Sequence, residues 1–489
     1  MRIFWTTTPP PSRRIEWPTG QDRESVRGAT PLNRTDDHIS VAHALQPRTI
    51  LLLSFFLLAI YVEGLMFAAS TYDTLVALII GPILLAISLP ALSRQAARER
   101  DRRLFWLLVI ALMVKLALGA VGQLYVIFKS YGGVADAAAY YREGWRLAQH
   151  FRQGNFTTGM HPIIGTNFIF ILTGYVLAVI GSSQTAAFML FSWMGFWGLF
   201  LFYRAFVIAV PEGSSRSYAR LLFFLPSLIF WPSAIGKDAW MVLALGIAAF
   251  GSARILTGHL WRGLAIAGVG FWMALMVRPH VAALAGLGLA AAYLLRQPRR
   301  DLRELAPVIK ALSFLAVAVV ALFLISRSNS FLREAGLNPT DVNSSLGTVG
   351  QNTSIGGSTF APSVATSVRR VPYAILTVVF RPILPDATNF QEGLAAVEGT
   401  LLLLFALARI RWIIAAARSV LRQQFIVLAA VHTGLFVLAF SSFSNFGLLM
   451  RERSSVLPFF LVLLCVPAKR KLFAGTDDPA LSKEAVSSA

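Results

Sequence analysis

The stretch Leu104–Phe128, LFWLLVIALMVKLALGAVGQLYVIF, decides the fold class of this chain. It is one apolar run, interrupted only by Lys115 and Gln123, and it exceeds the roughly 20 residues that a helix needs to cross a bilayer. Similar runs precede it at Ile50–Ala69 and Thr74–Leu92. Only 14% of the 489 residues are charged and 56% are hydrophobic, whereas soluble domains carry about a quarter charged residues. The sequence therefore predicts an all-α integral membrane protein, a polytopic helical bundle.

The net charge of +20 comes from basic residues gathered in short loops between the apolar runs. The clusters are Arg94, Arg98, Arg100, Arg102 and Arg103; Arg296, Arg299, Arg300 and Arg303; Arg409, Arg411, Arg418 and Arg422; and Lys469, Arg470 and Lys471. This is the pattern of cytoplasmic loops in multispanning proteins, and it favours membrane lipid headgroups as the partner and excludes nucleic acid.

The two ends of the chain differ from its middle. Residues 1–48 are polar and rich in Arg and Pro, which predicts a disordered cytoplasmic tail and not a signal peptide. Residues 49–467 form the membrane domain, and residues 468–489 form a second cytoplasmic tail. The single cysteine, Cys465, excludes an intramolecular disulfide and a thiolate metal site.

The basic loops also predict the path of the chain through the membrane. Placing them inside gives large outer loops at 129–162 and 327–371, with both termini cytoplasmic. The two apolar runs Ile163–Ile180 and Ala186–Val207 then lie between an outer and an inner loop, so only one of them can cross. Because Gly165, Gly174 and Gly181 interrupt Ile163–Ile180, we expect this segment at the outer interface or re-entrant, with about 12 crossings in total.

This topology brings the charged residues that are hardest to explain structurally to the outer face. Such residues are costly at membrane depth and usually pair or line a cavity. They are Asp136, with Tyr140 following it, His161, Lys237, Asp238, Arg278, His280, Arg381, Glu398, Arg451 and Arg453.

Each of these residues also has a structural interpretation. Asp136 can cap the expected helix Ala137–Phe151, and Lys237 with Asp238 can simply begin a helix. Arg278 can be a snorkelling residue in a turn, and Arg381 can pair with Glu398. Lys115, inside its span, is better explained as a polar contact between helices than as part of a site.

The outer set has the chemistry that transfer of a sugar from a lipid phosphate requires. Asp136 is the candidate general base for the acceptor hydroxyl, and the basic residues are candidates to stabilise the departing phosphate. An apolar groove whose walls lie within the membrane can hold the lipid tail of the donor. No cofactor motif is present in the sequence, although Asp136 or Asp238 can help to hold a divalent cation.

The stretch Ala135-Asp136-Ala137-Ala138-Ala139-Tyr140 resembles the Asp-containing first-loop motif of the GT-C superfamily of polyprenyl-phosphate-dependent glycosyltransferases. Ile163–Ile180 is similar to the juxtamembrane helices of that superfamily. Further stretches resemble bacterial membrane proteins of exopolysaccharide pathways: Ser233–Asp238, Arg278–His280, Ile355–Phe360, Val379–Glu398 and Asn445–Phe459. One departure is that three spans precede the Asp loop here, whereas simpler members have one.

The resemblance implies a GT-C-like fold in the bacterial inner membrane and an inverting glycosyltransferase or polysaccharide polymerase. Its donor would be a polyprenyl-(di)phosphate-linked sugar and its acceptor a glycan, with Asp136 as the catalytic residue. Two alternatives stay open: a transporter or flippase of lipid-linked glycan, and a non-catalytic scaffold of an envelope assembly complex. Transporters favour internal repeats and polar residues at the midplane, and neither is evident in this sequence.

Overall fold

The computed structural model describes residues 72–295, 367–388, 390–419 and 423–467, with a few positions between 314 and 364. These residues form helices and one isolated bridge between Thr359 and Asn445, with no strand among them. The prediction of an all-helical chain is therefore confirmed for this part of the protein. Several predicted segments lie outside the described residues: the tails 1–48 and 468–489, the span Ile50–Ala69, the basic group at 296–303, and most of the loop 327–371.

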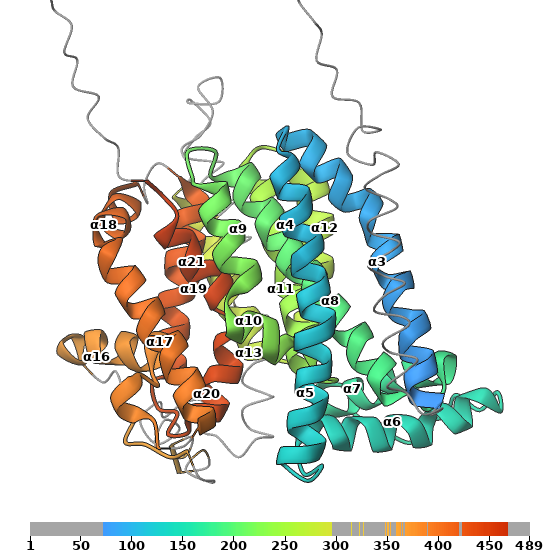
Figure 1. The fold of residues 1–489 in the computed structure, drawn as a ribbon. Helices are drawn as coiled ribbons and strands as arrows, with labels where there is room; N and C mark the ends of the chain where they lie inside the picture. The colour runs from blue at the N-terminus through green and yellow to red at the C-terminus, as the bar shows by residue number, and fades with distance from the viewer. Residues whose placement is uncertain are drawn as a thin grey trace, which may run out of the picture.

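The helices of the N-terminal half follow the apolar runs of the sequence closely (Figure 1). The first helix, α3 (Tyr72–Glu99), is followed by a second long helix, Arg102–Ser130, which contains two π-helical stretches. In order, the elements are α3 (Tyr72–Glu99), α4 (Arg102–Val114), η1 (Lys115–Val121), α5 (Gly122–Tyr125), η2 (Val126–Ser130), α6 (Asp136–Arg152), α7 (Gly165–Ile180), α8 (Gln184–Ala209), α9 (Ser215–Phe224), α10 (Pro226–Phe230), η3 (Trp231–Ser233), α11 (Lys237–Leu256), α12 (Leu260–Leu275) and α13 (Pro279–Leu294).

The C-terminal half contains shorter elements. They are η5 (Val368–Arg370), α16 (Val371–Ile375), η6 (Leu376–Phe380), η7 (Leu384–Asp386), α17 (Phe390–Ala408), α18 (Ile410–Ser419), α19 (Gln424–Phe440), α20 (Phe446–Arg453) and α21 (Leu457–Leu464). Proline lies in the first turn of α16 (Pro372) and of α21 (Pro458), where the backbone nitrogen needs no N–H partner.

Four of the described helices are long and apolar enough to cross a membrane: Tyr72–Glu99, Arg102–Ser130, Gln184–Ala209 and Lys237–Leu256. A fifth span results if Glu392–Ala408 and Ile410–Arg418, which meet at an angle of 62°, count as one. The membrane-protein character expected from the sequence is consistent with these helices. The total number of crossings stays a prediction.

Close helix contacts in the centre depend on small residues. A Cβ atom on Gly198 of α8 would lie 2.4 Å from the carbonyl oxygen of Val242 in α11. On the other side of this contact, a Cβ on Gly246 would lie 2.2 Å from the carbonyl oxygen of Gly198. Small residues that let backbones touch are the usual means by which helices pack in membranes. This contact holds α11, and with it Lys237 and Asp238, against the long helix α8.

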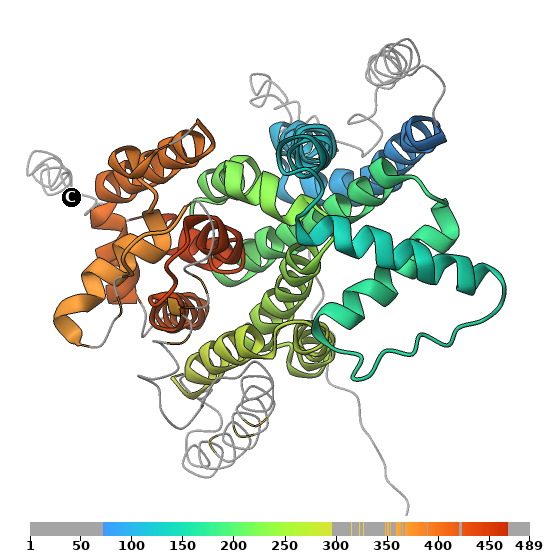
Figure 2. The same cartoon turned by 90° about the horizontal axis from the view of Figure 1, so that it is seen from below.

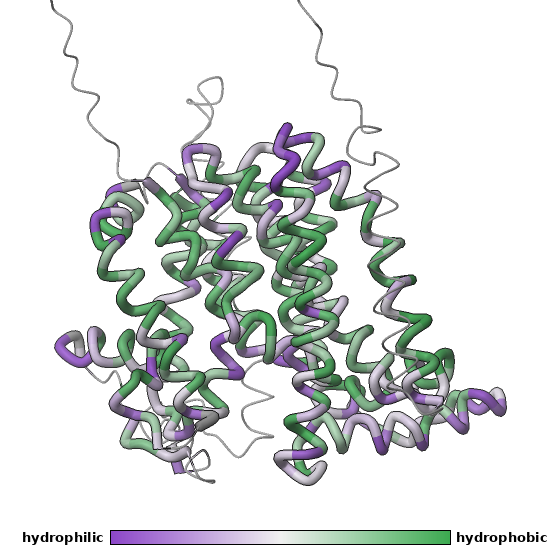
Figure 3. Tube along the Cα trace, viewed as in Figure 1, coloured by the Kyte–Doolittle hydropathy of each residue, from purple (hydrophilic) through white to green (hydrophobic). Residues whose placement is uncertain are grey.

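Helices α6 and α7 pack on each other and lie across one end of the long helices (Figures 1 and 2). The opposite end carries basic residues from distant segments. There Arg216 Nε lies 3.0 Å from Asp101 Oδ2, and Arg409 Nη1 donates to the carbonyl oxygen of Leu464 at 3.2 Å. Figure 3 shows apolar helices between these two more polar ends. The chain thus has a basic end and an α6 end.

Candidate functional site

Asp136 begins α6 and its carboxylate contacts α20, which is distant in sequence. The residue before it, Ala135, is the N-cap, and no side chain caps this helix, so the interpretation of Asp136 as a capping residue is wrong. Its Oδ2 instead accepts a hydrogen bond from Arg451 Nη1 at 2.7 Å. The side chain is 60% exposed and its Oδ1 has no hydrogen bond to the described residues. One oxygen of this carboxylate is therefore held and the other is free.

Arg451 joins Asp136 to a second, buried carboxylate. Its Nε lies 2.5 Å from Asp238 Oδ2, and the Asp238 side chain is only 9% exposed. Burial opposes the positive charge, but Asp238 and Asp136 together raise the pKa of Arg451 above its usual value. The guanidinium is therefore a fixed cation between two carboxylates.

Arg278, immediately before α13, extends this arrangement. Its Nη2 lies 3.0 Å from Asp238 Oδ1 and 2.7 Å from Glu452 Oε1, and its side chain is 7% exposed. A snorkelling Arg would reach water, so that interpretation of Arg278 is wrong. We call the six residues Asp136, Lys237, Asp238, Arg278, Arg451 and Glu452 the charge network.

Lys237 is the cation of the charge network that makes no ion pair with the residues described here. It starts α11 after Gly236, whose φ of +155° favours glycine. Its charge interacts with those of Asp136, Asp238, Arg278 and Arg451, yet no carboxylate oxygen of the described chain lies within 4.0 Å of it. Lys237 is thus the part of the network that is open to an added anion.

The charges of the network also act on Asp136 and Tyr140. Burial raises the pKa of the Asp136 carboxyl, but Arg451, Lys237 and Arg278 outweigh this effect and the pKa is lowered. Burial and the charge of Asp136 raise the pKa of Tyr140 to about 12. At neutral pH, Asp136 is therefore an anion and Tyr140 a neutral phenol.

The other residues expected in the site lie beside the network or apart from it. His280 follows Arg278 closely, and the charges of Arg278 and Lys237 act on its ring. His161 is exposed in the segment between α6 and α7. Arg381 pairs with Asp386 at 2.7 Å and not with Glu398, so the expected Arg381–Glu398 ion pair is wrong.

Glu398 and Arg453 belong to a neighbouring group of buried residues. Glu398 Oε2 accepts hydrogen bonds from the backbone N–H and the hydroxyl of Ser227, both at 2.9 Å. Arg453 donates through Nη2 to the carbonyl oxygen of Arg381. Arg453 is 1% exposed and makes no ion pair within 4.0 Å among the described residues, although its charge interacts with that of Glu398.

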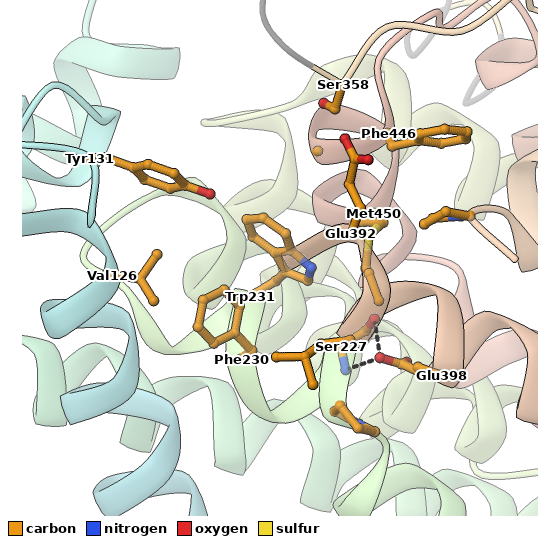
Figure 4. A pocket seen from close by; sticks show the side chains of 15 residues that line it. Val126, Tyr131, Ser227, Phe230, Trp231, Ser358, Glu392, Glu398, Phe446 and Met450 are labelled. Atoms are coloured by element: carbon orange, nitrogen blue, oxygen red, sulfur yellow. Dashed lines mark hydrogen bonds between the residues drawn. The ribbon is translucent and has the colours of Figure 1, made fainter. Parts of the chain in front are cut away.

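Two adjoining cavities lie at the charge network and at Glu398. The smaller, of about 80 Å³, is lined by Asp136, Asp238 and Arg451 among others. The larger, of about 480 Å³, is lined by Glu392 and Glu398 and by aromatic side chains (Figure 4). The cavities share four lining residues: Val126, Tyr131, Phe230 and Trp231. The sequence had indicated the polar residues here but not this shared aromatic wall.

Lys115 has the structural role that its position predicted. Its Nζ donates to the carbonyl oxygens of Leu228 at 2.9 Å and Ile229 at 3.2 Å, and to Ser233 Oγ at 3.0 Å. These acceptors belong to α10 and η3, which carry Phe230 and Trp231. Lys115 therefore fixes the wall between the two cavities.

Among the residues that the structure describes, no group of three His, Cys, Asp or Glu side chains could hold a metal ion. The carboxylates of Asp136 and Asp238 share Arg451 as their cation. Comparison of the chain with protein-family models, curated proteins and solved structures found no match.

Proposed function

We propose that the protein is an inverting membrane glycosyltransferase, or a polysaccharide polymerase with the same chemistry. Its donor would be a polyprenyl-(di)phosphate-linked sugar and its acceptor a glycan. The observation that carries the proposal is the contact of 2.7 Å between Asp136 and Arg451. It combines an ionised, exposed carboxylate that has a free oxygen with a fixed cation, and Lys237 supplies a second cation nearby.

In the proposed reaction, an acceptor hydroxyl attacks the anomeric carbon of the donor sugar on the face opposite the phosphate. The bond from the acceptor oxygen to that carbon forms while the bond to the phosphate oxygen breaks, and its electron pair leaves with the phosphate. The hydroxyl proton passes to Oδ1 of Asp136. Lys237 and the N–H groups of Arg451 that its carboxylate partners leave free stabilise the charge that develops on the phosphate.

The proposal includes a GT-C-like arrangement in the bacterial inner membrane, with about 12 crossings and both termini in the cytoplasm. The charge network would then face the outer side of the membrane, where α6 and α7 lie at the interface. The separation of the basic end from the α6 end supports this orientation, because cytoplasmic loops carry the excess of Lys and Arg. The apolar lining of the larger cavity is compatible with a lipid-linked substrate.

The test is the substitution Asp136→Asn in the source strain, with polysaccharide output and lipid-linked intermediates measured at matched expression. Glu143→Gln is the matched control, because Glu143 lies on the same helix and pairs only with Arg146, at 2.6 Å, among the described residues. We expect Asp136→Asn to abolish output and to accumulate the donor on the outer leaflet. Accumulation on the inner leaflet would support a flippase instead, and unchanged output would refute the assigned role.

A scaffold makes a different prediction for the same network. If the protein is a non-catalytic scaffold and these charges take no part in its function, then Lys237→Gln together with Asp136→Asn leaves polysaccharide output unchanged in a well-expressed protein. A transferase loses output in both single variants, because the base and the cation act on different atoms of the reaction.

A further inference from the structure

The larger cavity has a chemical character different from that of the charge network. Its lining combines four aromatic side chains with two carboxylates: Tyr131, Phe230, Trp231, Phe446, Glu392 and Glu398. Its volume of about 480 Å³ lies within the range of small-molecule sites, which are mostly apolar with a few polar groups. Figure 4 shows these side chains arranged around the space, with Glu398 at Ser227.

One carboxylate oxygen of Glu398, Oε1, accepts no hydrogen bond from the described residues. The side chain is buried, with the residue 7% exposed. Ser227 supplies both hydrogen bonds to Oε2, whereas Oε1 is buried without a hydrogen-bond partner among the described residues. Buried carboxylate oxygens are normally satisfied. A ligand with an O–H or N–H donor would satisfy this oxygen.

The lining is also poorly suited to a phosphate. None of its described lining residues is Lys or Arg, and two are carboxylates. An anionic group would therefore find no cation in this lining, whereas Arg451 lines the smaller cavity and the charge of Lys237 interacts with that of Arg451. The two cavities thus suit opposite ends of one reaction: phosphate at the charge network, and hydroxyl or amino donors at Glu398.

We infer that the larger cavity is the acceptor site, and that it binds a neutral or amino-bearing saccharide through hydrogen bonds donated to Glu398. The aromatic wall formed by Phe230 and Trp231 borders both cavities. A saccharide that rests on this wall reaches from Glu398 toward Asp136, which would receive the proton of its hydroxyl. This assignment of an acceptor site rests on the proposed function, but saccharide binding itself can be measured without any transfer.

The test is cysteine labelling, which is practical because the chain has a single cysteine, Cys465, that can be replaced. In a Cys465→Ala background, Ala395→Cys places a thiol in the lining of the cavity, and Gln153→Cys places one at the exposed end of α6 as the control. The labelling rate by a maleimide is measured on the full chain in nanodiscs. The probes are neutral oligosaccharides from a hydrolysate of the strain's own surface polysaccharide, and glucose 1-phosphate.

We expect the neutral oligosaccharides to slow labelling at Ala395→Cys and not at Gln153→Cys, with glucose 1-phosphate inactive at both. Adding Glu398→Gln, which puts an amide N–H₂ in place of Oε1, should raise the concentration needed for protection about tenfold. Absence of protection, or equal protection by the sugar phosphate, overturns the inference even if Asp136→Asn abolishes output. Protection in a protein whose output survives Asp136→Asn keeps the saccharide site and refutes the transferase.

Discussion

The charge network predicts that its two aspartates contribute very differently to stability. Both carboxylates pair with Arg451, but the Asp238 side chain is 9% exposed and that of Asp136 is 60% exposed. Removing one partner of a buried pair costs about 3–5 kcal/mol because the other charge is left buried. An exposed pair is worth about 1 kcal/mol or less. We therefore expect Asp238→Asn to lower the free energy of unfolding by about 3 kcal/mol and Asp136→Asn by less than about 1 kcal/mol.

The measurement is a pair of double-mutant cycles with Arg451→Gln, using reversible SDS unfolding of the protein in mixed micelles. The cycle with Asp238 should show a coupling energy of about 2 kcal/mol or more, and the cycle with Asp136 about 0.5 kcal/mol or less. This difference matters for function, because a residue that contributes little to stability yet is needed for output must act in the chemistry. Equal coupling energies in the two cycles would refute the reasoning.

Three further predictions concern pH and packing. Because the folded-state pKa of Asp136 is lowered, its contribution to stability is present above its unfolded value of about 3.9 and is lost as the pH falls through the folded value. Because Arg451 lowers the pKa of Asp136, Arg451→Gln should move the acid limb of the pH–rate profile for sugar transfer to higher pH. An unmoved profile would contradict this. Gly198→Ala should destabilise the protein by about 1–3 kcal/mol, because its Cβ would meet the α11 backbone at 2.4 Å. Gly122→Ala, whose Cβ would have nothing within 4 Å, is the control and should not destabilise it. Equal melting temperatures of the two variants would argue against the close contact between α8 and α11. Lys115→Met should cost about 1–3 kcal/mol in SDS unfolding, because it removes the Lys115 donor from the buried carbonyl oxygen of Leu228. A neutral effect would remove its role in holding the cavity wall.

Most helices could be predicted from the sequence because apolar runs of membrane length leave a helix few alternatives. The expected helix Ala137–Phe151 is α6 (Asp136–Arg152), and Ile163–Ile180 is α7 (Gly165–Ile180). The apolar stretch 221–231 does not form one helix, because the chain leaves helical geometry at Leu225, between α9 and α10. The residue before a proline disfavours helical geometry, so Pro226 explains the break.

The candidate site could be predicted only as a set of residue types on one side of the membrane. The structure brings Asp136 and Arg451 together although 315 residues separate them, and no pattern in a single sequence encodes such a contact. Local competition explains the failed pairing of Arg381 with Glu398, because Asp386 lies five residues away and takes both guanidinium contacts. The aromatic wall around Trp231 was missed because the chain has 36 Phe, 11 Trp and 11 Tyr residues, and their positions in a single sequence do not show which of them share a wall.

The most direct test of the central claim is a single-turnover assay with purified protein and the lipid extract of a strain that lacks the gene. In this assay, mass spectrometry follows the lipid-linked sugar and the extended glycan. The account predicts that the wild-type protein and Glu143→Gln convert donor into extended product, whereas Asp136→Asn leaves the donor unconsumed while remaining folded. Extension of the glycan by Asp136→Asn at the wild-type rate would contradict the account.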